Sequence, residues 1–153
     1  IRSVHHNVTF SIEEGLQTIV EAVCIAETYD LNIICKCIPL LILAKHIAKV
    51  GIKMVLSGLG ANEIFSEDIV FTGSIINKCM QSQGVTCSVP FLTSSVIHMA
   101  TVGLSKEKVK EFFKECVPKY TICTMADQRW VEACKQYGEN KIRLIYNTVF
   151  PER

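Results

Sequence analysis

The segment VLSGLGANEIF, residues 55–65, combines small and polar residues in a pattern that could bind phosphate. It reads as a strand that runs into a glycine-containing turn and then into a helix. The backbone N–H groups of such a turn, with those of the first helical turn, can bind an anion. The small and polar residues of this segment that could contact a nucleotide phosphate are Ser57, Gly58, Gly60, Asn62 and Glu63.

Eight cysteines form the second group of chemically active residues. The closest pair is Cys35 and Cys37, there is no C-x-x-C, and no histidine stands at zinc-finger spacing from a cysteine. Several cysteines lie within apolar helical patterns, and a chain of this length can build a core without disulfides. We therefore expect reduced, buried thiols and no metal site. The alternative is a thiol or metal-binding protein that uses Cys35 and Cys37.

The elements that would position the glycine turn are two helices and a strand. A capping-box pattern at Ser11 and Glu14 predicts a helix to about Tyr29. Pro39 is expected in the first turn of a second helix, which the next glycine ends. The apolar segment 52–56 then predicts a buried parallel strand. Helix, strand, glycine turn and helix in this order indicate a crossover unit of an α/β sheet.

The second half of the chain is predicted to be mainly helical. Residues 66–83 show no clean period and are expected to be partly helical. Residues 88–92 read as an extended segment, because Pro90 disfavours the α region for the residue before it. Further helices are expected from Ser94 or Ser95 to about Val102, from Ser105, and around Trp130 and Ile145.

Composition describes one globular domain. The chain has 153 residues, of which 49% are hydrophobic and 20% are charged, with a net charge of +1 and no basic run that would indicate a nucleic-acid partner. The longest apolar stretch, residues 37–44, is far shorter than the roughly 18 residues that span a membrane, and predicts a core helix. The chain starts at Ile1 without a leader pattern, so we expect residues 1–153 to be a single, partial domain.

Several segments in the same order resemble the carboxy-terminal synthetase domain of glutamine-hydrolysing asparagine synthetases. HHNVTFSIEEGLQTIVEAVCIAETYD, residues 5–30, is similar to the family segment that follows the first nucleotide loop. PLLILAKHIAKVGIKMVLSG, residues 39–58, resembles the next helix and strand. GVTCSVPFL, residues 84–92, resembles the family's G-L-E-A-R-V-P-F-L-D.

The resemblance implies a fold and a reaction. The fold is α/β, of the adenine-nucleotide α-hydrolase-like (PP-loop) type. The reaction is that of a ligase of amino-acid biosynthesis in the cytoplasm, in which ATP and Mg2+ activate aspartate as a β-aspartyl adenylate and ammonia then gives asparagine. The principal pyrophosphate loop of the family, S-G-G-x-D-S, does not occur in the 153 residues. The resemblance therefore predicts an incomplete synthetase domain.

The same resemblance locates substitutions at the expected site. The family turn is S-G-E-G-S-D-E, and here Leu59 occupies the position of its first glutamate while Asn62 occupies that of an aspartate associated with magnesium. An alkyl side chain cannot accept a proton, and a neutral amide is a weaker magnesium ligand than a carboxylate. Other polar positions of the family are changed as well, to Cys35, Thr86, Ser88 and Thr93.

These substitutions favour an asparagine-synthetase-like domain with impaired catalysis, in which no catalytic residue is assigned and ATP and Mg2+ enter by resemblance alone. One alternative is an active piece that binds ATP and aspartate and is completed by a second chain. Another is a structural interaction protein. An incomplete sheet would also expose the edge of strand 52–56, which predicts self-association unless a neighbouring chain covers it.

Overall fold

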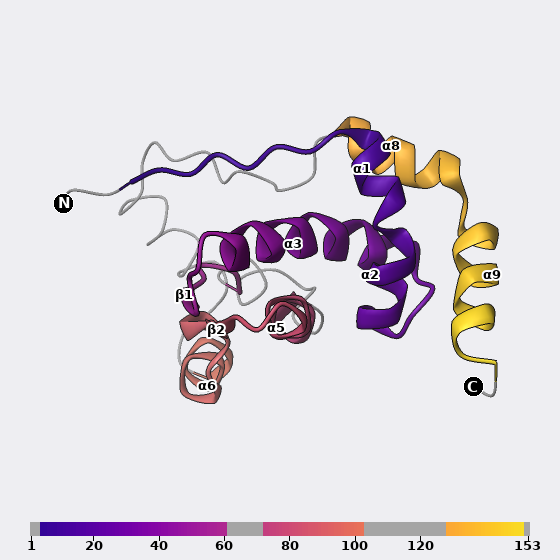
Figure 1. Ribbon diagram of the computed structural model, residues 1–153. Helices are drawn as coiled ribbons and strands as arrows, with labels where there is room; N and C mark the ends of the chain where they lie inside the picture. The colour runs from indigo at the N-terminus through magenta and orange to yellow at the C-terminus, as the bar shows by residue number, and fades with distance from the viewer. Residues whose placement is uncertain (1–3, 61–71, 103–127, 152–153) are drawn as a thin grey trace.

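The computed structural model describes residues 4–60, 72–102 and 128–151. Figure 1 shows the long helix α3 across the middle of the molecule, with α1, α2 and α8 around one end and the two strands at the other. The elements are α1 Ile12–Gln17, α2 Ile19–Ala26, α3 Leu31–Lys49, β1 Met54–Leu56, α5 Thr72–Ser82, β2 Thr86–Ser88, the 3-10 turn η1 Pro90–Leu92, α6 Ser94–Val102, α8 Gln128–Tyr137 and α9 Glu139–Val149.

The first helical segment begins at the predicted capping box. Ser11 Oγ accepts the Glu14 N–H at 3.1 Å, and Glu14 Oε2 accepts the Ser11 N–H at 2.9 Å. The prediction of one continuous helix to Tyr29 is wrong, because the chain divides into α1 and α2 at Thr18. The Thr18 hydroxyl donates to the Glu14 carbonyl at 2.7 Å, and such local side-chain bonds compete with regular helix.

Helix α3 begins eight residues before Pro39, so the prediction that this proline opens the helix is wrong. Asp30 is the N-cap, and its Oδ1 accepts the Asn32 N–H at 2.8 Å. Pro39 lies inside the helix, where it has no N–H to give to the carbonyl of Cys35 four residues earlier. The indole Nε1 of Trp130 donates to that carbonyl at 3.0 Å and takes the place of the missing bond.

The predicted glycine stop at the end of α3 is confirmed. Gly51 has φ +87°, and its N–H donates to the Ala48 carbonyl at 3.0 Å while the Ile52 N–H donates to the Ile47 carbonyl at 3.2 Å. These two bonds form a Schellman motif, which satisfies the last carbonyls of the helix and turns the chain toward β1.

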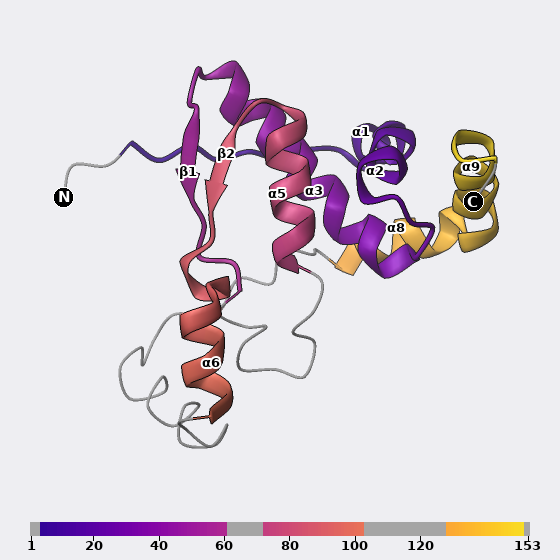
Figure 2. The ribbon, with the colours of Figure 1, turned by 90° about the horizontal axis from the view of Figure 1, so that it is seen from below.

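Strands β1 and β2 pair in parallel, and α5 lies between them in the sequence. The register aligns Met54 with Thr86, Val55 with Cys87 and Leu56 with Ser88. The predicted parallel strand within 52–56 is confirmed, but its predicted burial is wrong, since Met54 is 68% and Leu56 78% exposed. Only Val55 and its partner Cys87 pack against the core, because the described helices cover one face of the pair. Figure 2 shows α5 and α3 beside the strands.

The second half of the described chain is mainly helical, as predicted. Helix α5 occupies much of the segment expected to be partly helical, and α6, α8 and α9 confirm three further predictions. The segment 88–92 is extended only to Ser88, because Pro90 begins a 3-10 turn that ends at Leu92. The helix predicted from Ser105 lies outside the described residues.

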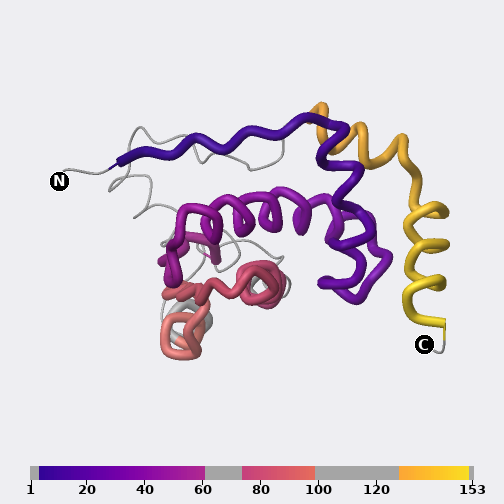
Figure 3. The backbone as a smooth tube through the Cα atoms, viewed as in Figure 1, coloured from indigo at the N-terminus to yellow at the C-terminus, as the bar shows by residue number. Residues whose placement is uncertain are grey.

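The core lies between α3 and the helices around it. Eight residues of α3 are buried, as expected for a core helix. By length and composition alone α3 could also cross a membrane, but a core helix passes the same test. Figure 3 shows the extended segment before α1 running along α3 in the opposite direction, which brings His6 within 6.0 Å of His46 between ring centroids.

Candidate functional site

The turns that follow β1 and β2 lie at the same edge of the strand pair, since both strands run in the same direction. The Ser57 N–H donates to the Ser88 carbonyl at 2.9 Å and holds the start of the first turn against the end of β2. In open α/β sheets, ligands bind outside the carboxyl ends of the strands. The predicted residues Ser57, Gly58 and Gly60 are therefore placed where such a site would form, whereas Asn62 and Glu63 lie outside the described residues.

The glycine turn has a defined backbone. Ser57 Oγ accepts the Leu59 N–H at 3.2 Å, so the hydroxyl occupies one of the amides that the turn could offer to an anion. Gly60 has φ +99°, and a methyl group at this position would overlap the side chain of Leu92 from the second turn. Gly58 has open space around it. Gly60 is thus required by conformation and by close packing between the two turns.

Leu59 is turned toward the protein rather than toward solvent. Its side chain is half-buried and packs against the hydrophobic core, as apolar burial favours. A carboxylate in the same place would be partly removed from water, which is unfavourable unless the charge is paired. The position that the resemblance gives to a glutamate therefore contributes packing here.

The second turn carries hydroxyl groups. Thr86 and Ser88 are exposed on β2, and the Thr93 hydroxyl donates to the Pro90 carbonyl at 3.0 Å, which closes the 3-10 turn. Burial raises the pKa of the neighbouring Cys87 thiol, which disfavours its thiolate. Apart from the Cys87 thiol, none of the side chains in 57–60 or 86–93 is acidic or basic, so these residues supply no carboxylate, imidazole or ammonium group.

Cys35, one of the positions that the resemblance marks as changed, lies within the helical core. Its thiol hydrogen bonds with that of Cys134 on α8, and this bond lowers the pKa of Cys35 against the opposing effect of burial. Cys37, two residues further along α3, contacts Cys79 on α5 instead. Two residues along a helix point to nearly opposite sides. The idea that Cys35 and Cys37 form one thiol or metal site is therefore wrong.

The described residues do not fit a magnesium site. Within residues 4–60, 72–102 and 128–151, no group of three or more histidine, cysteine, aspartate or glutamate side chains could hold a metal ion. Magnesium is usually bound through carboxylates and water. The groups that the described part of the glycine turn presents are its backbone and the Ser57 hydroxyl.

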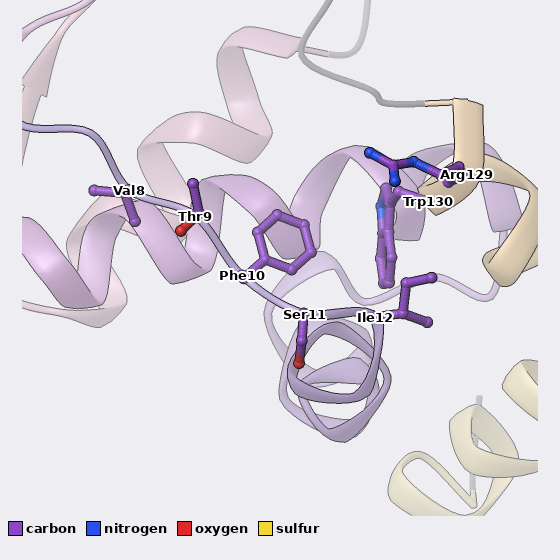
Figure 4. Close-up of a pocket in the computed structure, with 7 residues that line it drawn as sticks. All are labelled: Val8, Thr9, Phe10, Ser11, Ile12, Arg129 and Trp130. Carbon is purple, nitrogen blue, oxygen red and sulfur yellow. The ribbon is translucent and has the colours of Figure 1, made fainter.

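A hollow of about 470 Å³ lies near the other end of α3, away from the strand ends. Figure 4 shows Phe10 and Trp130 side by side in its lining, and their rings meet edge to face with centroids 5.4 Å apart. Its lining comes from residues 8–12 and from the start of α8. The sequence predicts only a helix around Trp130, because nothing in the local pattern shows that residues so far apart in the chain meet.

Comparison with known proteins matches these elements to one family. The family model described as asparagine synthase matches residues 1–67, which include the capped first helix, α3, β1 and the glycine turn. Asparagine synthetase [glutamine-hydrolyzing] 1 of Saccharomyces cerevisiae is 41% identical over an alignment that covers 93% of this chain and 29% of the yeast protein. The chain belongs to the asparagine synthase family. The asparagine synthetase B [glutamine-hydrolyzing] of Escherichia coli is 28% identical, with 92% of this chain and 33% of the bacterial protein covered.

This asparagine-synthase-family chain spans about a third of the length of these two relatives. The residues matched by the family model end at 67, so they contain the glycine turn but not β2. The relatives' alignments extend over most of the chain. The mixed helical structure with a small parallel sheet agrees with the α/β fold expected for the family.

Proposed function

We propose that this chain forms the strand-end region of an ATP-dependent asparagine synthetase domain and that its catalysis is impaired. The activity of the relatives supports the general function, and the parallel strands with their two adjoining turns support the location of the site. Because the chain spans about a third of those relatives, its substrates, ATP and aspartate, are part of the proposal. The proposed location is the cytoplasm. In this proposal α3 is a helix of the protein core and does not cross a membrane.

The observation that carries the proposal is the environment of Leu59. Its side chain packs against the core at the position that the resemblance assigns to a glutamate at the reacting centre. General acid–base catalysis requires a titratable group within hydrogen-bond reach of the substrate. A leucine cannot supply it, and its apolar packing makes the turn a structural part of the fold.

The glycine turn supports weak nucleotide contact at most. Gly60 keeps the backbone conformation that brings the two turns together, but the Leu59 N–H is already bonded to Ser57 Oγ. An incoming phosphate would have to displace that hydroxyl before it could accept the same N–H. We therefore expect ATP with Mg2+ to bind more weakly than the micromolar level, which corresponds to about 8 kcal/mol.

Calorimetric titration of the full 153-residue chain with ATP and Mg2+ tests this proposal. The unchanged chain is compared with the double variant Leu59→Glu/Asn62→Asp, which introduces the two carboxylates. The matched control is Leu59→Gln, which keeps the native Asn62. The glutamine variant has the size and polarity of glutamate without its charge. Stronger binding in the double variant alone supports the loss of carboxylates as the cause. Micromolar binding by the unchanged chain would overturn the proposal.

A second proposal is that the chain works as part of an active synthetase completed by another chain. The observation in its favour is the exposed face of the strand pair, where Met54 and Leu56 are available for contact. Light scattering of the purified chain tests for self-association, and a monodisperse monomer would argue against an exposed edge that needs a partner. Asparagine formation on adding a polypeptide that carries the S-G-G-x-D-S loop would favour the two-chain enzyme over the impaired domain.

A further inference from the structure

Cys37 and Cys79 bring two thiols together in the core. Cys37 lies on α3 and Cys79 on α5, and their Sγ atoms are 3.4 Å apart. Both residues are completely buried. The Sγ atoms also lie near backbone carbonyls, Cys37 Sγ at 3.9 Å from that of Ala22 and Cys79 Sγ at 3.8 Å from that of Cys37.

The two sulfurs lie close to bonding distance. A disulfide has an S–S length of about 2.05 Å, so the sulfurs would have to approach by roughly 1.4 Å. They contact each other directly, and the helices that carry them pack side by side in the core. A small rotation of the two side chains is therefore a shorter path to a disulfide than any movement of whole elements.

The two thiols differ in how readily they lose a proton, and Cys79 is the one that becomes the nucleophile. The hydrogen bond from the Cys37 thiol lowers the pKa of Cys79, although burial opposes this shift. The same hydrogen bond and burial raise the pKa of Cys37. Cys79 therefore forms the first thiolate, which the neighbouring Cys37 thiol stabilises. The sulfur of Cys37 then attacks in the second step.

The geometry points to a redox-sensitive staple in which Cys37 and Cys79 form a disulfide when the chain meets a small peroxide. The Cys79 thiolate attacks one peroxide oxygen, the O–O bond breaks, and water leaves with a sulfenic acid on Cys79. The sulfur of Cys37 attacks Sγ of Cys79, the S–O bond breaks, and a second water carries away the remaining proton. Two thiols lose two protons and two electrons in total, and one peroxide takes them up to become two waters.

The staple would act on the candidate site without including it. The two cysteines stand 42 positions apart, and the segment between them contains β1 and the glycine turn. A disulfide would fix α5 on α3 and restrict the opening of this segment. From the length of the closed loop we expect the melting temperature to rise by about 10 °C on oxidation. This inference does not depend on the proposed function.

Burial determines which oxidant can reach the pair. Hydrogen peroxide is small enough to enter during local opening of the core, whereas glutathione disulfide must approach an exposed sulfur. Cys24 on α2 is such an exposed thiol. We expect peroxide to link Cys37 to Cys79 and glutathione disulfide to modify Cys24 first.

The test treats the full folded chain with hydrogen peroxide, blocks the remaining thiols by alkylation, and identifies linked peptides by mass spectrometry after digestion. The expected result is a peptide pair joining residue 37 to residue 79 that dithiothreitol separates. Cys24→Ser is the matched control and should give the same link and the same thermal shift. Cys79→Ala should give neither, and circular dichroism checks that it folds.

Two results would overturn the inference. In the first, both thiols of the unchanged chain remain open to alkylation after peroxide treatment and unfolding. In the second, Cys37 or Cys79 is linked to a different cysteine. The peptide map of the unchanged chain decides between these outcomes even if Cys79→Ala does not fold.

Discussion

Trp130 and Pro39 form a compensating pair that can be tested by a double-mutant cycle. Pro39 deprives the Cys35 carbonyl of its helical donor, and the indole N–H of Trp130 supplies one at 3.0 Å. Both Trp130 and Cys35 are buried. The effect of Trp130→Phe on the free energy of unfolding should therefore depend on whether residue 39 is proline or alanine.

The magnitude follows from the buried acceptor. Trp130→Phe leaves the Cys35 carbonyl without a donor, which costs about 1–3 kcal/mol, and the smaller ring adds a packing loss. In the Pro39→Ala background, the new N–H at residue 39 can donate to the same carbonyl within α3. Trp130→Phe should then cost only its packing loss, so the cycle should yield a coupling free energy of about 1–2 kcal/mol.

Urea unfolding of the four chains, followed by circular dichroism, measures this coupling. Fluorescence cannot be used throughout, because Trp130 is the only tryptophan. The slope of the unfolding free energy against urea should be equal in the four chains. Additive effects of the two substitutions, within about 0.3–0.5 kcal/mol, would refute the idea that the indole replaces the bond lost at Pro39.

Three further predictions test other parts of the structure. Gly60→Ala should destabilise the chain by about 1–3 kcal/mol in urea unfolding, because of its positive φ and the overlap with Leu92, whereas Gly58→Ala, in open space, should cost less than Gly60→Ala. Ser11→Ala should cost about 0.5–2 kcal/mol by loss of the capping box, and Ser11→Thr should restore most of it; equal stability of the alanine and threonine chains would contradict the cap. Lys45→Ala should change the unfolding free energy by less than about 1 kcal/mol, because Lys45 and its partner Glu21 are both about 40% exposed. A larger loss would show that this ion pair contributes more to stability than its exposure implies.

Local signals were sufficient to predict several elements. The capping box at Ser11 and the glycine stop at Gly51 depend on residues close together in sequence, and both are confirmed with their hydrogen bonds. The parallel strand after Gly51 is also confirmed, although its pairing partner β2 follows it only after α5. The cap and the stop are determined by backbone bonding within a few residues.

Errors arose where distant residues decide the outcome. Pro39 was assigned to a helix start, because the sequence does not show that Trp130, far along the chain, satisfies the carbonyl that a proline leaves open. Strand 52–56 was expected to be buried on both faces, but burial depends on how many elements cover the sheet. Cys35 and Cys37 were considered together, although the helix directs them to Cys134 and Cys79.

The candidate site was predicted only in part. Ser57, Gly58 and Gly60 lie at the strand ends as the glycine turn indicated, but Asn62 and Glu63 remain predictions. Neither the hydrogen bond of Ser57 Oγ to the Leu59 N–H nor the packing of Gly60 on Leu92 could be read from the turn itself. Both depend on the precise backbone path and on the neighbouring turn.

The most direct test of impaired catalysis is aspartate-dependent exchange of labelled pyrophosphate into ATP, which reports formation of the β-aspartyl adenylate. The full chain is assayed with ATP, Mg2+ and aspartate, and without aspartate as the blank. Because Leu59 packs against the core at the position that the resemblance assigns to a glutamate, we predict exchange no greater than the blank. Exchange above the blank by the unchanged chain would contradict the account.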